Sequence, residues 1–253
     1  MIDPRLISAE MLKLRRRRGM LSIALLGTLG SMLIGFTVLV IQHNSNAAKY
    51  GPAGGLANYQ GAIDFLSLMA LVAGAIIGAT AGTQDIESGV FRDLAATGRS
   101  RVALFGSRVT GAWAVALPIT ALAAVFAGMA SVALAGSLPE PGAGALAAGT
   151  GLALTAAALS TAMGVGVAAL VGSRGPVIGI LLAFFLAVQP ILQQLAFLGD
   201  ARGAIPSVAL NRIGDLPPMS DIHVALGSAI AVVVAWAAAA VAAGAWRTRT
   251  CEI

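Results

Sequence analysis

Long runs of apolar residues alternate with short polar segments along the whole chain. A helix needs about 20 apolar residues to cross the roughly 30 Å of hydrocarbon in a bilayer. Six runs reach that length, at residues 20–41, 61–83, 109–135, 145–171, 177–198 and 222–246. The pattern therefore predicts an all-α integral membrane protein with six transmembrane helices. We expect one transmembrane domain over residues 1–253, with the six-helix bundle over residues 20–246.

The composition points the same way and narrows the possible partners. Charged residues make up only 11% of the 253 residues, whereas about a quarter is usual in a soluble domain. So few charges cannot cover a soluble globule, and much of the surface must face lipid. The net charge of +5 would also fit a nucleic-acid binder. The basic residues form no continuous stripe, however, so we expect membrane lipids and no nucleic acid as partners.

The distribution of basic residues predicts the orientation of the chain. All but three of the 16 Lys and Arg residues lie in the N-terminal segment, the second-to-third loop, the fourth-to-fifth loop or the C-terminal tail; the three are Lys49, Arg202 and Arg212. Basic residues in short loops mark the cytoplasmic side. We expect a multi-pass protein with both termini in the cytoplasm. The preference for Arg over Lys, with abundant Ala and Gly, favours a bacterial plasma (inner) membrane.

Residues 84–101, between the second and third runs, contain helix-capping residues and a helical spacing of apolar residues that a simple loop would not need. Asp85 suits the N-cap of a helix, and Gly98 suits the position that ends one. Four apolar residues fall on one face at helical spacing, namely Ile86, Val90, Phe91 and Leu94. The pattern predicts a short amphipathic helix whose apolar face docks on the protein's own helices or on a partner.

This segment also carries a family resemblance. Its order of Glu, Gly, Arg-x-Leu and Ser-Arg resembles the ABC-2 type permeases, the transmembrane subunits of bacterial ABC transporters. The matching positions are Glu87, Gly89, Arg92, Leu94 and Ser100-Arg101. The chain departs from the family pattern at Val90, where Thr is common, and at Gly98, where Pro is common. Arg108 stands for the family's Lys. With the six runs, the resemblance covers nearly the whole chain.

The resemblance implies a cytoplasmic coupling helix that sits in a groove of a separate ATPase subunit. The residues it assigns to this contact are Asp85, Ile86, Glu87, Gly89, Val90, Phe91, Arg92 and Leu94. The alternative is an interfacial helix that only anchors the loop. The resemblance further implies an exporter built from two permease copies, identical or paralogous, and two ATPase subunits.

Nothing in the chain predicts catalysis of its own. Neither lysine is followed by Ser or Thr, so a GxxxxGK[ST] phosphate loop is absent from the sequence. We expect no catalytic residue, no metal site and no cofactor bound by this chain, with ATP and Mg²⁺ held by the partner ATPase. Two other functions remain open: a secondary transporter or channel without an ATPase, or a membrane anchor that transports nothing. The first would place ionisable pairs in mid-membrane.

The first 18 residues predict an amphipathic helix before the first span. Asp3 can cap it, with Pro4 at its first position. Ile7, Met11 and Leu14 form an apolar stripe. The segment resembles the elbow helix of the same family, which lies in the headgroup plane. Its interfacial anchor would be the basic run Arg15, Arg16, Arg17 and Arg18, which either binds anionic lipid or only sets the orientation.

Small and polar residues inside the runs suggest contacts. Gly74, Gly78 and Gly82 form a ridge along which helices approach closely, within one subunit or between two. Gln189 and Gln193 share a face beside Pro190. They either line a substrate path, bond across a dimer interface, or satisfy backbone groups freed by the proline. Beyond them, residues 208–213 predict a short outer helix, and the resemblance implies that it closes the path.

Overall fold

The computed structural model describes residues 4–87, 89, 100–215 and 224–250, which contain helices and no strand. Six helical segments are long and apolar enough to span a membrane, as the sequence predicts. They are Arg18–Ser45, Leu56–Asp85, Arg101–Ala133, Ala143–Val171, Arg174–Gln194 and Leu226–Thr250. The chain is therefore an all-α, multi-pass membrane protein.

Two of the spans contain π-helical turns. The first consists of α2 (Arg18–Leu25), η1 (Leu26–Gly30) and α3 (Ser31–Ser45), and the fifth of α9 (Arg174–Ala183), η2 (Phe184–Val188) and α10 (Gln189–Gln194). The amide of Gln189 donates to the carbonyl of Phe184, five residues back. This wider turn directly precedes Pro190, which has no N–H to donate.

The other spans are single helices: α5 (Leu56–Glu87), α7 (Arg101–Ala133), α8 (Ala143–Val171) and α12 (Leu226–Thr250). Shorter helices precede, join or follow them, namely α1 (Pro4–Arg15), α4 (Ala47–Tyr50), the 3₁₀ segment η3 (Ala196–Ala204) and α11 (Pro206–Ile213). The helix α11 confirms the short helix predicted over residues 208–213. Because α5 and α7 run past the predicted apolar runs, Asp85 and Arg108 lie inside helices.

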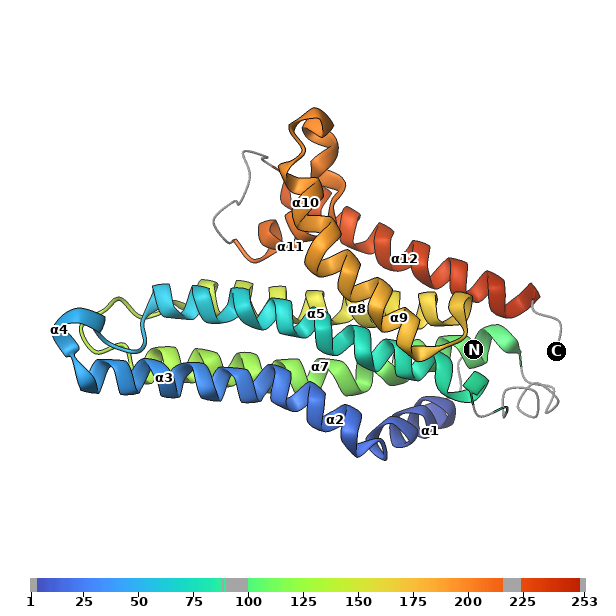
Figure 1. The fold of residues 1–253 in the computed structure, drawn as a ribbon, viewed down its shortest axis with the longest axis horizontal. Coiled ribbons are helices and arrows are strands. Elements are labelled where there is room, and N and C mark those ends of the chain that lie inside the picture. The colour runs from blue at the N-terminus through green and yellow to red at the C-terminus, as the bar shows by residue number, and fades with distance from the viewer. Residues whose placement is uncertain (1–3, 88, 90–99, 216–223, 251–253) are drawn as a thin grey trace.

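The long helices α3, α5, α7 and α8 lie roughly along the molecule, and α9 crosses them obliquely toward α10 and α11 (Figure 1). One end of the bundle holds α1, the end of α5, the start of α7, the α8–α9 connection and the last turn of α12 (Figure 1). We call this the terminal end. The opposite end, with α4 and the α7–α8 connection, is the distal end.

The glycine ridge predicted in the second span packs α5 against α8. A Cβ added to Gly78 would lie 2.3 Å from the carbonyl oxygen of Thr161. At Gly74 and Gly82 it would lie 2.1 Å from Ser160 Oγ and 2.4 Å from Ala168 Cβ, respectively. Only glycine leaves room for so close an approach of two backbones. Of the two contacts that the sequence left open, the structure shows the one within a subunit.

The N-terminal helix α1 is docked on the bundle. Leu14 is buried with Met20, Phe105 and Val109 in a cluster that joins α1 and α2 to α7. Gly111 allows the approach, because a Cβ there would lie 2.6 Å from the Cβ of Glu10. The helix itself matches the sequence prediction, whereas its docking on the bundle through Leu14 was not predicted, and its proposed cap, Asp3, lies outside the described residues.

Candidate functional site

Four charged side chains meet where α1, α5 and α7 converge at the terminal end. Asp85, in the last turn of α5, accepts a hydrogen bond from Arg108 Nη2 at 3.0 Å and one from Lys13 Nζ at 3.1 Å. Lys13 also donates to Glu10 Oε1 at 2.8 Å. We call Glu10, Lys13, Asp85 and Arg108 the Asp85 cluster. Through it, one carboxylate joins the N-terminal helix to the second and third spans.

The Asp85 cluster is mostly withdrawn from solvent. The side chains of Arg108 and Asp85 are 2% and 6% exposed. Burying a charge is costly unless it is paired at close range, so removing either Asp85 or Arg108 would destabilise the protein by leaving the other charge buried without this partner. Lys13 lies nearer the surface. Burial alone would lower the pKa of Lys13, but its ion pairs with Glu10 and Asp85 raise that pKa above the usual value.

This geometry corrects part of the sequence analysis. Asp85 does not cap a new helix, because α5 continues through it to Glu87. Gly89 has a φ of 73°, a left-handed conformation that a continuous helix from Asp85 to Leu94 would not contain. Arg108, which we expected at a loop, is buried in the second turn of α7. The chain therefore uses Asp85 as an internal ion-pair partner.

Some of the predicted coupling residues lie within the described part of the chain and others do not. Asp85, Ile86 and Glu87 end α5, and Gly89 follows them. Val90, Phe91, Arg92 and Leu94 lie outside the described residues, so their predicted helix stays a prediction. Glu87 has a partner that the sequence did not suggest. Its Oε1 accepts a hydrogen bond of 2.9 Å from the backbone amide of Arg174, the first residue of α9. The end of the second span thus holds the start of the fifth.

A second polar cluster lies between α10 and α11. Gln189 is 1% exposed, and its Oε1 accepts a 2.8 Å hydrogen bond from the backbone amide of Ser207. Gln193 Nε2 lies 2.6 Å from Ser207 Oγ. The backbone carbonyl oxygen of Gln193 accepts a hydrogen bond from Arg202 Nη1 at 3.2 Å. Gln189, Gln193, Arg202 and Ser207 form what we call the Gln189 cluster.

The Gln189 cluster confirms that Gln189 and Gln193 share a face, and it shows what that face contacts. Ser207 is the second residue of α11, and its amide has no acceptor in the preceding turn, so Gln189 caps this helix from another one. The Nε2 atom of Gln189 is buried and has no partner among the residues that the structure describes. The glutamines therefore attach α11 to the fifth span.

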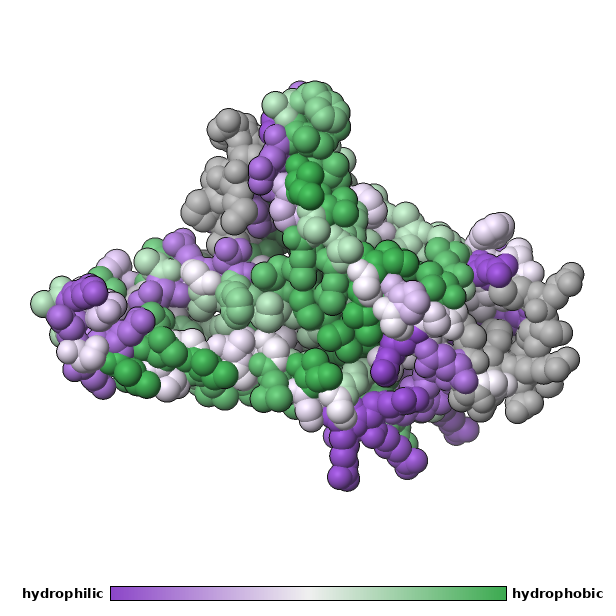
Figure 2. All heavy atoms as spheres, viewed as in Figure 1, coloured by the Kyte–Doolittle hydropathy of each residue, from purple (hydrophilic) through white to green (hydrophobic). Residues whose placement is uncertain are grey.

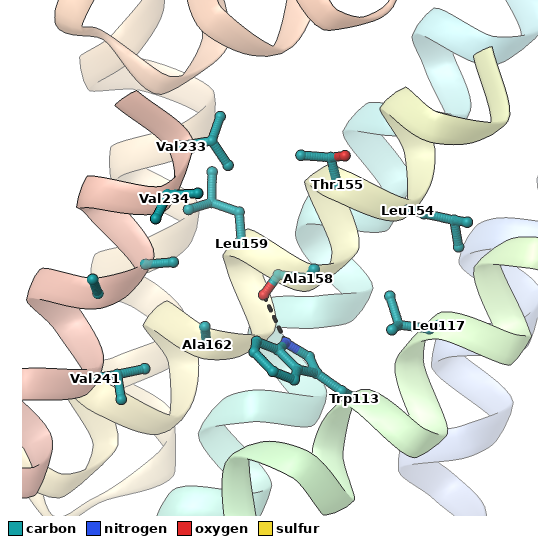
Figure 3. A pocket seen from close by; sticks show the side chains of 12 residues that line it. Trp113, Leu117, Leu154, Thr155, Ala158, Leu159, Ala162, Val233, Val234 and Val241 are labelled. Atoms are coloured by element: carbon teal, nitrogen blue, oxygen red, sulfur yellow. Dashed lines mark hydrogen bonds between the residues drawn. The ribbon is translucent and has the colours of Figure 1, made fainter. Parts of the chain in front are cut away.

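An apolar groove of about 570 Å³ runs between α7, α8 and α12 (Figure 3). Trp113 lies at one side, and its indole N–H donates to the carbonyl of Ala158 at 2.9 Å (Figure 3). Thr155 is also satisfied, by the carbonyl of Gly151. A molecule in this groove would therefore be held by apolar contacts, chiefly with Leu117, Leu159 and Val234.

Hydrophilic residues gather over α1 and the start of α2, while apolar residues cover the middle of the long helices (Figure 2). The four arginines predicted as an anchor, Arg15 to Arg18, are all exposed there. Their exposure at the foot of the first span fits an interfacial position. In the described parts of the chain, no group of three or more His, Cys, Asp or Glu side chains could hold a metal ion.

No protein-family model matches this chain, and no curated protein is significantly similar to it. The functional interpretation therefore depends on the residues and their geometry.

Proposed function

We propose that this chain is the membrane permease subunit of an ATP-driven exporter of the ABC-2 type. It moves its substrate across the plasma membrane with energy from separate ATPase subunits, which bind ATP and Mg²⁺. Two permease copies and two ATPase subunits form the transporter, and both termini of each permease lie in the cytoplasm.

The observation that carries the proposal is the connection of four elements beside the segment 88–99. Asp85 contacts α1 and α7 through Lys13 and Arg108, and Glu87 contacts the start of α9. A partner that pushed on this segment would move the end of α5. Because buried ion pairs resist separation, that movement would reach the N-terminal helix and the third and fifth spans together.

The position of the buried charges supports a permease over a secondary transporter. Ionisable pairs that carry ions or protons belong near the middle of the membrane. The Asp85–Arg108 pair joins the last turn of α5 to the second turn of α7, at the terminal end. A chain that served only as an anchor would need these links for stability alone, whereas a permease also needs them to transmit movement from this loop.

The substrate path is proposed to run between the two permease copies. Gln189 and Gln193 would act at its outer end by holding α11, since both contact Ser207. The apolar groove beside Trp113 would suit a lipid-like or drug-like substrate, because its polar groups are already paired.

Purification of the tagged protein from its own cells in mild detergent tests this function. We expect a nucleotide-binding subunit at stoichiometric amount, identified by mass spectrometry. A Glu87→Ala, Phe91→Ala double variant should lose it. The matched control is an Asp215→Ala, Phe197→Ala double variant, which removes an exposed acid and an exposed phenylalanine elsewhere. A wild-type protein that purifies alone and without ATPase activity would overturn the proposal in favour of a secondary transporter or an anchor.

A further inference from the structure

A cavity of about 430 Å³ opens at the terminal end between the start of α2, the side of α5 and the start of α9. Two arginines far apart in the sequence, Arg17 and Arg174, line it together. Its remaining side chains are apolar: Met20, Ile23, Ile76 and Ile178. Both arginines are exposed, and neither guanidinium has an ion pair or hydrogen bond within the described residues.

The order of these residues follows the depth of a membrane leaflet. Arg17 directly precedes the first span and Arg174 begins the fifth, so a bilayer around these spans would place both arginines at headgroup level. Ile23 and Ile178 lie one to two helical turns further into the same spans, at the level of acyl chains. Within the described residues, the Glu87 carboxylate lies close to Arg174, but it accepts the backbone amide of that residue and makes no ion pair with the guanidinium.

We propose that this cavity binds an anionic glycerophospholipid from the surrounding bilayer. Its phosphate would lie between Arg17 and Arg174, and an acyl chain would follow Met20, Ile23 and Ile178 inward. Guanidinium groups suit phosphate because they offer several donors in a plane. The start of α2 adds the positive end of a helix dipole, whereas at the start of α9 the Arg174 amide is already bonded to Glu87 and only its guanidinium faces the lipid.

The cavity distinguishes Arg17 from the other basic residues of the N-terminal run. Of the four arginines Arg15 to Arg18, only Arg17 lines it. A general attraction of basic residues to an anionic surface would use all four alike. The cavity, in contrast, predicts that one of them acts with a residue more than 150 positions away. The bound lipid would hold α2 and α9 together against α5. This inference rests on the membrane spans alone and does not require transport.

The test compares retained lipid by native mass spectrometry of the full chain, purified in detergent with equal amounts of phosphatidylglycerol and phosphatidylcholine. We expect phosphatidylglycerol to be retained preferentially. An Arg17→Gln, Arg174→Gln double variant should bind it roughly tenfold or more weakly, since each charge contributes about 1 kcal/mol near an anionic lipid. The control, Arg15→Gln with Arg16→Gln, removes the same charge beside the cavity and should retain the lipid like the wild type.

A second arm separates the lipid from a small anion. Phosphatidylglycerol should raise the unfolding temperature of the wild type, while inorganic phosphate should not. An Ile178→Ser variant should weaken phosphatidylglycerol retention, because it places a polar group on the acyl wall. Equal losses in the double variant and its control would overturn the proposal, as would equal retention of the two lipids. Equal stabilisation by inorganic phosphate would replace the lipid by a small-anion site.

Discussion

The Asp85 cluster and the Gln189 cluster both join segments that are distant in the sequence, but they do so with different chemistry. At the terminal end, charged groups pair in a buried setting, with Asp85 contacting both Lys13 and Arg108. Between α10 and α11 the groups are mostly neutral, and one of them, Gln189 Nε2, keeps no partner among the described residues. An ionic contact is hard to break once buried, whereas a neutral one with a spare donor can rearrange at lower cost.

This difference suits the two positions in the proposed transporter. The charged cluster would keep α1, α5 and α7 together while force is transmitted. The neutral cluster would let α11 leave the fifth span when the outer end opens. The predictions below test this contrast in order of decreasing effect.

Removing Asp85 should have the largest effect. An Asp85→Ala variant takes the carboxylate from the buried Arg108, which should cost about 3–5 kcal/mol of stability. We expect a large fall in unfolding temperature. Size-exclusion chromatography of samples heated in detergent would measure it. An Asp85→Leu, Arg108→Met variant should recover much of the loss, because an apolar pair replaces the ions. A double variant no more stable than Asp85→Ala would show that the pair itself is not the source.

The glycine ridge should come next. Gly78→Ala forces α5 from α8, and overpacking of this kind costs about 1–3 kcal/mol. Gly179→Ala is the matched control, since a Cβ there meets nothing within 4 Å. The same chromatographic assay should separate the two variants. A Gly179→Ala protein destabilised as much as Gly78→Ala would contradict a specific packing role for the ridge.

Gln189→Leu should have a smaller and more local effect. It removes the acceptor for the Ser207 amide, at a cost of about 0.5–1.5 kcal/mol, because this hydrogen bond is only partly buried and water can replace the lost acceptor. Hydrogen exchange by mass spectrometry should then speed up in Pro206–Ile213 and remain unchanged at the terminal end. Gln194→Leu is the control, because Gln194 is exposed. Faster exchange throughout the chain would contradict a local attachment.

Lys13→Gln should have the smallest effect, about 0.5–1 kcal/mol, because Lys13 is partly exposed and its ion pairs are screened by water. Its pKa in the folded protein lies above the usual value of 10.5. The contribution of Lys13 is therefore complete below pH 10.5 and is lost as the pH rises through the folded pKa. The stability difference between wild type and variant should stay constant from about pH 7 to 9 and narrow above 10.5. A difference that changed below pH 9 would implicate another group.

The signals for the two clusters were unequal in the sequence. Gln189 and Gln193 stood out as polar residues four apart in an apolar run, and their shared face is confirmed. Ser207 carried no such signal, since a serine in a polar connecting segment is ordinary. Glu10 did carry a signal. It is an acid beside the apolar stripe of α1, between Ile7 and Leu14, and an acid at such a position needs a partner when the stripe is buried.

The six spans could be read from the chain alone, because crossing hydrocarbon demands a run of apolar residues that is visible without any partner. The same holds for the short helix α11 and the contact face of Gly74, Gly78 and Gly82. The folded chain was needed to show that α8 packs on that face, that Asp85 pairs with Lys13 and Arg108, and that Arg17 and Arg174 line one cavity. These partners lie tens to more than a hundred residues apart. The spacing of residues within one helix shows which of them share a face, but it does not show which distant helix packs on that face. The packing of the helices brings these residues together.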